Sequence, residues 1–122
     1  MDLDRLKFVI KDEQGTTYKD CAKAIGRSVS YFSDRMNGKA NFTIEEAEML
    51  GNYLKLYNYE KRMIFFDEVF TREEQFELVL QEDRNRCRNE IKTMIDEIEN
   101  VEFLEKISMF IGVFHRKERE NA

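Results

Sequence analysis

The sequence contains no proline and only five glycines in 122 residues. Both residues mark turns, bulges and linkers, so their scarcity argues against a fold of many short strands or stiff linkers. No run approaches the ~18 apolar residues of a membrane span, and the first residues, Met1 to Arg5, lack the basic and then apolar pattern of a signal peptide. We therefore expect a cytoplasmic protein without a membrane partner.

Cysteine and histidine are equally scarce, with Cys21, Cys87 and one histidine, His115. A zinc site needs about four nitrogen or sulfur ligands, and the cysteines form no CxxC pair, so we expect no metal and no cofactor. Both cysteines lie in helix-like contexts and are expected to be buried, reduced thiols; a regulatory thiol or an intermolecular disulfide is the alternative.

Signals of catalysis are also missing. The sequence has no Gly-rich phosphate loop, no nucleophile motif and no carboxylate pair that stands out from its general acidic background. We therefore expect a protein that is not an enzyme.

Charged residues make up 37% of the chain and hydrophobic residues 42%, including ten Phe and five Tyr. This composition favours charged-faced helices around a real core, in one domain or in one domain plus an appendage. The net charge of −5 is unevenly distributed: residues 15–39 carry five basic and two acidic side chains, whereas residues 71–122 carry nine basic and thirteen acidic ones. The local field, rather than the total charge, governs an encounter with phosphate.

Helix start signals recur along the chain, each with a side-chain oxygen placed to cap a first turn. With an opening helix at about residues 2–13 they predict seven helices, and the capping residues are Thr17, Ser28, Thr43 (with Glu46), Asn58, Thr71 (with Glu74) and Asn100.

Apolar residues at helical spacing predict one core for the first five helices. They are Leu6, Ile10, Cys21, Ala22, Ile25, Phe32, Met36, Phe42, Ala47, Leu50, Leu54, Ile64 and Phe65. Beyond residue 69 two longer stripes predict an amphipathic helical hairpin over residues 70–122, which is too small to bury both faces alone. We expect these stripes to form a dimer interface through Leu80, Ile91, Met94, Ile98, Leu104, Ile107, Ile111 and Phe114; packing on the first domain, or a site for a regulatory protein partner, is the alternative.

The most informative stretch is residues 17–39, in which a short helix, a turn at Gly26 and a second short helix ending at Asn37-Gly38 have the layout of a helix-turn-helix. Ala22 is small where the two helices cross, and Gly26 can adopt the positive φ of the turn. The exposed face of the second helix can then enter a DNA major groove, which is ~12 Å wide.

Residues 3–67 resemble the Cro-type repressor family of temperate phages and mobile elements. The resemblance adds three further elements to the helix-turn-helix: Asn37-Gly38-Lys39, residues 42–47 (FTIEEA), and Tyr59-Glu60-Lys61 leading to Phe65-Phe66. It implies an all-α fold in which a five-helix DNA-binding bundle, residues 1–69, precedes the C-terminal hairpin. It also implies a transcriptional repressor that binds double-stranded DNA as a homodimer on a two-fold operator.

The resemblance also implies roles for individual residues. The base-reading positions of the family fall on Val29, Ser30, Ser33 and Asp34, and its phosphate-binding positions fall on Thr17, Tyr18, Lys19, Asn37 and Lys39. Arg27 and Arg35 join the candidates for phosphate binding because of their charge, although Arg27 is equally well explained as a solvated turn residue.

The chain departs from the family at Asp34, because phosphate repels a carboxylate, and in lacking the Arg or Gln that reads bases in many relatives. Asp34 either pairs with a cytosine amino group or is a salt-bridged side chain beside a cation such as Arg35. These departures leave an alternative function open, a protein-interaction module such as an antirepressor or antitoxin-like partner that binds DNA weakly.

Overall fold

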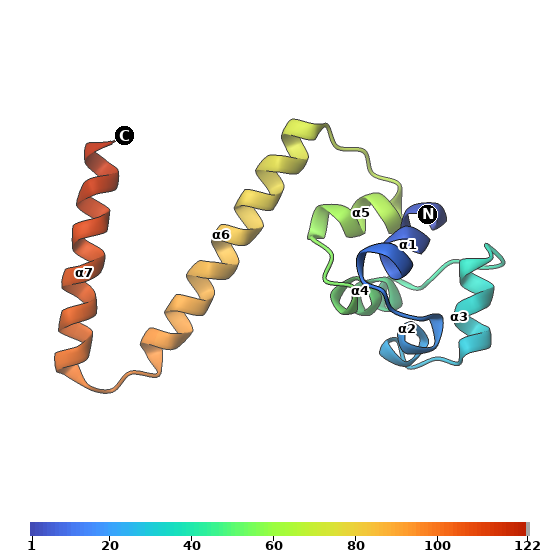
Figure 1. Cartoon of the computed structure of the whole chain (residues 1–122), viewed down its shortest axis with the longest axis horizontal. Helices are drawn as coiled ribbons and strands as arrows, with labels where there is room; N and C mark the ends of the chain where they lie inside the picture. The colour runs from blue at the N-terminus through green and yellow to red at the C-terminus, as the bar shows by residue number, and fades with distance from the viewer. Residues whose placement is uncertain (122) are drawn as a thin grey trace. The chain divides into compact units, whose positions relative to one another are not determined.

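The computed structural model describes residues 1–121, and this part of the chain consists of helices and turns, with no strand (Figure 1). The all-α prediction is confirmed. The elements are α1 (Leu3–Phe8), the π-helix η1 (Val9–Glu13), α2 (Tyr18–Ala24), α3 (Val29–Met36), α4 (Ile44–Tyr53), α5 (Asn58–Phe66), α6 (Arg72–Asp96) and α7 (Val101–Glu120). Over the described residues no helix is long and apolar enough to cross a membrane.

The chain divides into two compact units, and the division falls inside α6, between Glu82 and Asp83. We expected the first domain to end at residue 69. The first unit extends beyond that point because residues around the start of α6 contact α5. The Phe70 ring lies 6.4 Å from the Tyr59 ring, and the Asn58 N–H donates to Glu82 Oε1 at 2.9 Å.

Side-chain caps define where several helices begin. The side-chain oxygens of Thr17, Ser28 and Asn100 accept first-turn N–H bonds at 3.2, 3.1 and 3.2 Å, as predicted. Asn58 is different, because it is already the first residue of α5 and the cap position belongs to Tyr57. Glu60 Oε1 reaches back to the Tyr57 N–H at 3.2 Å, so the carboxylate at the third helical position, rather than Asn58, satisfies a free donor.

The opening helix covers the predicted range but changes type after Phe8. We predicted one helix over residues 2–13, but the α-helical part ends at Phe8 and is followed by η1, which ends with a bond from the Gln14 N–H to the Val9 carbonyl at 2.9 Å. Gly15, at φ +58°, then reverses the chain. A glycine in the left-handed region is a common helix terminator because it carries no Cβ.

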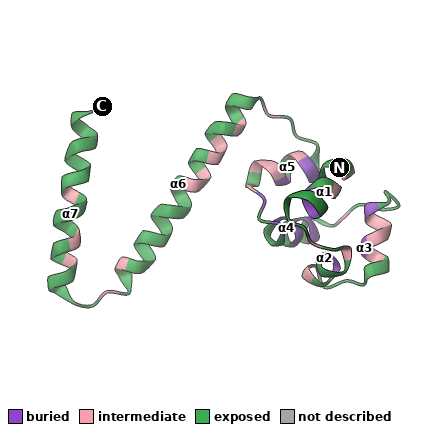
Figure 2. Cartoon of the chain, in the orientation of Figure 1, coloured by how far each residue is buried: buried purple, intermediate pink, exposed green. Residues whose placement is uncertain are grey.

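The core lies in the first unit (Figure 2). Every predicted core residue is buried except Phe42, which is half-buried and packs against the others, and Val9 and Leu56 join them. Phe42 connects two parts of this core, because its ring lies 5.5 Å from the Phe32 ring and 6.1 Å from the Phe65 ring. The core therefore holds α3 and α5 to the same aromatic cluster.

The long helices are built differently. No residue of α6 or α7 is buried (Figure 2). The helices of the second unit therefore present their apolar side chains to solvent in a single chain.

Candidate functional site

The connection between α2 and α3 is a tight turn that requires glycine. Gly26 has φ +69°, and a Cβ built on it would meet no atom within 4 Å, so the backbone angle rather than space favours glycine here. The N–H groups of Gly26 and Arg27 bond to the carbonyls of Lys23 and Ala22 at 3.1 and 2.9 Å and close the end of α2. Ser28 then caps α3.

The two helices cross over a small, closed contact. Ala22, Ile25 and Phe32 are 1%, 4% and 0% exposed, so these predicted core residues are buried where α2 and α3 meet. Because one side of α3 is held in this way, its other side faces outward.

The four candidate base-reading residues share that outer face of α3. Val29, Ser30, Ser33 and Asp34 stand at positions i, i+1, i+4 and i+5, which lie side by side on a helix. Val29 is 46% exposed, Ser30 is exposed, and the other two are half-buried. The structure thus brings these residues together, with one apolar group, two hydroxyls and one carboxylate.

Asp34 is salt-bridged, and its partner is Lys39. Asp34 Oδ1 lies 3.4 Å from Lys39 Nζ, beyond the end of α3. We had considered Arg35 as the neighbouring cation, but Arg35 packs against Tyr31 instead. A base-reading candidate and a phosphate-binding candidate are therefore paired with each other.

The remaining candidates for phosphate binding differ in how accessible they are. Lys19, Asn37 and Lys39 are exposed, at the first turn of α2 and beyond the end of α3. Thr17 is occupied as the cap of α2. Tyr18 is half-buried, with its ring 5.3 Å from the Phe32 ring, and burial first, then the nearby Cys21, raises the pKa of its hydroxyl.

A buried carboxylate joins α4 to α3 and to the turn. Glu46 is 2% exposed, and it accepts bonds at 3.0 Å from the hydroxyl of Tyr31, from Arg27 Nε and from the Thr43 N–H. Burial alone raises the pKa of Glu46, but the bonds from Thr43, Tyr31 and Arg27, together with the charge of Arg27, outweigh it and leave this pKa below its ordinary value. Sequence analysis identified Glu46 only as the end of a capping box and missed its link to α3.

Tyr31 also organises the two arginines. The Arg35 guanidinium carbon lies 3.5 Å from the Tyr31 ring centroid, and the Arg27 carbon lies 4.8 Å from it. Arg35 Nε is buried with no hydrogen-bond partner among the described residues. Arg27 is thus a structural partner of Glu46 and Tyr31, rather than a freely solvated turn residue.

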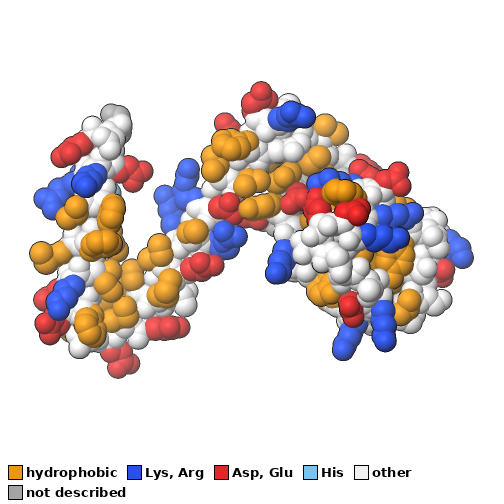
Figure 3. All heavy atoms as spheres, viewed as in Figure 1, with side chains coloured by type: hydrophobic (Ala, Val, Ile, Leu, Met, Phe, Trp, Pro, Cys, Tyr) orange, Lys and Arg blue, Asp and Glu red, His pale blue; other side chains and the backbone are white. Residues whose placement is uncertain are grey.

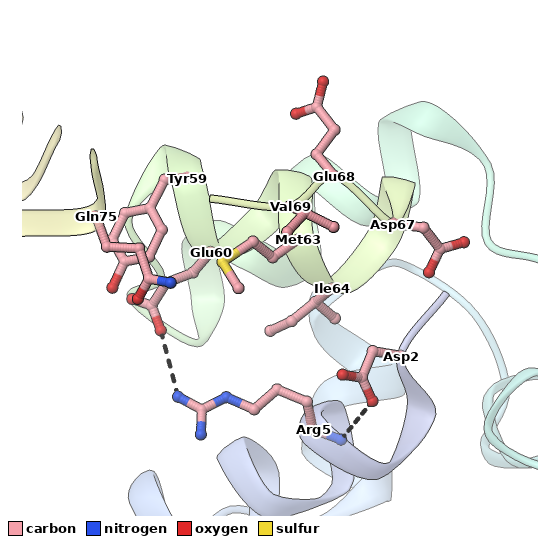
Figure 4. A pocket seen from close by; sticks show the side chains of 10 residues that line it. All are labelled: Asp2, Arg5, Tyr59, Glu60, Met63, Ile64, Asp67, Glu68, Val69 and Gln75. Atoms are coloured by element: carbon pink, nitrogen blue, oxygen red, sulfur yellow. Dashed lines mark hydrogen bonds and ion pairs between the residues drawn. The ribbon is translucent and has the colours of Figure 1, made fainter. Parts of the chain in front are cut away.

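A separate cavity of about 560 Å³ lies between α1, α5 and the start of α6 (Figure 4). Its charged groups are engaged in structural contacts: Asp2 Oδ1 accepts from the Arg5 N–H at 3.0 Å, and the Arg5 guanidinium lies 3.9 Å from Glu60 Oε2. The pKa of Glu60 is raised, mainly by burial and further by the charge of Glu13, and the bond from the Tyr57 N–H offsets only part of this rise. These contacts explain the carboxylates without a ligand.

The predicted dimer residues lie on α6, on α7 and in the turn between them. Ile98, Leu104 and Ile107 are half-buried, while Leu80, Ile91, Met94, Ile111 and Phe114 are exposed. Further apolar side chains that we had not assigned to the interface are also exposed on α7. We define the apolar surface of the second unit as Ile91, Met94, Val101, Phe103, Met109, Phe110, Ile111, Val113 and Phe114 (Figure 3).

Cys87 lies outside this surface and corrects one expectation. Cys21 is buried, as predicted, whereas Cys87 is an exposed free thiol on α6. It is exposed because neither α6 nor α7 has a buried position in a single chain.

No family model, no curated protein and no solved structure matches the chain. Two surfaces carry the functional interpretation: the outer face of α3 and the apolar surface of the second unit.

Proposed function

We propose that this chain is a sequence-specific DNA-binding transcriptional regulator, a repressor that binds a two-fold operator as a dimer. The observation that carries the proposal is the outer face of α3, where four candidate base-reading residues lie together. α3 has eight residues, so it is about 12 Å long. With its side chains an α-helix is about 10–12 Å across, and this diameter fits the major groove of B-DNA, which is ~12 Å wide. In this arrangement α2, the Gly26 turn and α3 form a helix-turn-helix.

The chemistry of this face suits the edges of base pairs. Val29 can contact a thymine methyl group, and the hydroxyls of Ser30 and Ser33 can donate to or accept from either base type. The exposed Lys19, Asn37 and Lys39 supply phosphate contacts beside it, which fix register without reading sequence.

The Glu46 network adds preorganisation. Its bonds to Tyr31 and Arg27 tie the first turn of α3 and the preceding turn to the buried Glu46 in the first turn of α4. A helix held by a buried, fully bonded carboxylate keeps its outer face in one orientation, which reduces the ordering cost of docking into a groove.

A dimer follows from the apolar surface of the second unit and from the weakness of one short recognition helix. Two linked half-site contacts raise affinity through a high effective concentration.

The Asp34–Lys39 pair favours a second candidate function, a protein-interaction module, because it offsets one cation that would otherwise contact phosphate.

The test begins by selecting duplexes from random double-stranded DNA with the full chain and measuring affinity by fluorescence anisotropy as salt varies. With roughly three phosphate contacts per half-site, log K should fall with log salt at a slope of about −5. Lys19→Ala should weaken selected and scrambled duplexes equally, whereas Ser30→Ala should weaken only the selected one, about fivefold for a ~1 kcal/mol base contact. Lys92→Ala, an exposed lysine of α6, is the matched control and should change neither affinity. Failure to enrich any duplex, or binding that does not depend on salt, would contradict the proposal and favour the interaction module.

A further inference from the structure

α7 is apolar on two opposite sides. At about 100° per residue, Ile107 and Ile111 point to one side, while Met109 and Val113 lie about 160° away around the helix. Phe110 lies between them, and is 66% exposed. A surface helix buries one stripe against one neighbour, so a helix with two such sides needs two neighbours. The other helix of the second unit, the part of α6 that begins at Asp83, leaves side chains on both sides exposed: Ile111 is 47%, Met109 74% and Val113 44% exposed.

The size of the apolar surface of the second unit indicates what covers it. Its nine side chains are between 44% and 74% exposed. At roughly 150–250 Å² for a large side chain, the exposed parts amount to about 900 Å² per chain. A standard interface between two proteins buries ~800 Å² on each partner. The surface is thus large enough for a second copy of the same unit.

The charges of the second unit are polarised along its helices. We call residues 96–106, around the turn between α6 and α7, the tip; it carries five acidic side chains and one lysine. We call residues 83–90 and 114–120 the base; it carries six arginines and lysines and four acidic side chains. The two segments of the base belong to one end because the short connection between α6 and α7 makes these helices run in opposite directions. The tip is therefore acidic, and the base is basic.

The geometry points to an antiparallel pairing: we propose that the second units of two chains form a four-helix bundle in which the tip of each lies against the base of the other. In this arrangement the net charge of −4 at each tip faces the net charge of +2 at a base. A parallel bundle with the same apolar contacts would bring the two acidic tips together. Electrostatic complementarity of this kind selects among orientations that the apolar contact alone does not distinguish. The inference rests on the dimer of the proposed function, and it does not depend on DNA binding.

Neutralising the tip distinguishes the two orientations. The variant Glu97→Gln/Glu99→Gln/Glu105→Gln removes three of the five tip acids and leaves Glu102 in the first turn of α7. For the full chain, sedimentation should give a dimer that weakens as salt rises, and the triple variant should dimerise about tenfold more weakly with a smaller salt dependence. The variant Glu73→Gln/Glu74→Gln/Glu77→Gln is the matched control: it makes the same change in net charge on α6 within the first unit, and its dimer affinity should equal that of the parent. A tip variant that dimerises more tightly would show that the tips meet, and would overturn the antiparallel pairing.

Cross-linking gives a second measurement that does not depend on charge. In a Cys87→Ser background, Val101→Cys marks the tip and Asn85→Cys marks the base. A short bis-maleimide should join the two variants when they are mixed, and it should leave Val101→Cys alone largely uncoupled. Efficient coupling of Val101→Cys to itself would overturn the orientation while leaving a dimeric regulator intact. A full-length chain that sediments as a monomer at micromolar concentration would overturn both the pairing and the dimer; the DNA-binding measurement above would still report separately on α3.

Discussion

Replacing Glu46 by Gln should destabilise the first unit by about 2 kcal/mol at neutral pH. Hydrogen bonds to a charged group are worth roughly 1.5–3 kcal/mol, and Gln keeps one carbonyl acceptor for the donors of Thr43 and Tyr31. The pair with Arg27 adds less, because the Arg27 side chain is 51% exposed and water screens its charge. The loss should therefore lie near the lower end of that range.

Glu60→Gln is the matched control, because Glu60 holds the same third position in α5 that Glu46 holds in α4. Its acceptor role towards the Tyr57 N–H can pass to the Gln carbonyl. Burial raises the pKa of Glu60, so its negative charge is disfavoured in the folded state, and its ion pair with Arg5 spans 3.9 Å at a half-exposed partner. Neutralising it should cost under about 0.5 kcal/mol.

The assay is thermal unfolding followed through tyrosine fluorescence. All five tyrosines lie between residues 18 and 59, so this signal reports on the first unit alone. For a unit of this size, a loss of 2 kcal/mol lowers the Tm by roughly 10 °C.

The stabilisation by Glu46 should be lost in acid. The pKa of Glu46 is lowered in the folded state, so its contribution is complete above the ordinary value of 4.5 and disappears as the pH falls through the lower folded value. The difference in Tm between the parent and Glu46→Gln should therefore shrink in acid. The reasoning is refuted if Glu46→Gln and Glu60→Gln lower the Tm equally at neutral pH, or if the Glu46→Gln difference persists in strong acid.

Two further outcomes test local structure. Gly26→Ala should destabilise the first unit by about 1 kcal/mol, because φ is +69° there. Gly112→Ala, in the interior of α7 where a Cβ meets no atom, should instead raise the helix content. If circular dichroism shows the same change in helix content and stability for both variants, the assigned turn is contradicted. In the native chain a maleimide should label only the thiol of Cys87, which is exposed. Cys21 should not react, because its burial and, to a smaller extent, the nearby Asp20 raise the pKa of its thiol to about 11. Mass spectrometry that finds both thiols labelled at equal rates would show that the core opens readily.

The elements that sequence analysis predicted well depend on residues close together in the chain. A cap needs one side-chain oxygen and an N–H three residues away, so Thr17, Ser28 and Asn100 could be read directly. Helical spacing likewise identified the core, since the side chains that share a face are fixed by the 3.6-residue period. The cap predicted at Asn58 is wrong because another side chain satisfies the free donor: Glu60 accepts from the Tyr57 N–H, and Asn58 is the first residue of α5.

The main feature that sequence analysis missed, the bonds of Glu46 to Tyr31 and Arg27, depends on contacts between distant residues. Nothing in the capping-box pattern indicates that Glu46 also reaches Tyr31 and Arg27, which lie 15 and 19 residues away. The ion pair of Asp34 could be expected from its chemistry, but the choice of Lys39 over Arg35 depends on the Tyr31 ring that holds Arg35. The Glu46 contacts thus depend on how the helices of the first unit pack, and the partner of Asp34 depends on competition among nearby side chains; a one-dimensional pattern specifies neither.

The two units differ in what a single chain can satisfy. The first unit buries its apolar residues within itself, so its pattern and its structure agree residue by residue. α7 has 20 residues and no buried position, and most of the stability of a helix in a protein comes from the packing of its amphipathic face. That packing is missing in a single chain, because side chains on both apolar sides of α7 are exposed. In the proposed dimer, the helical order of the second unit would be coupled to association, and the contacts that make this unit fold would also set the separation of the two α3 helices.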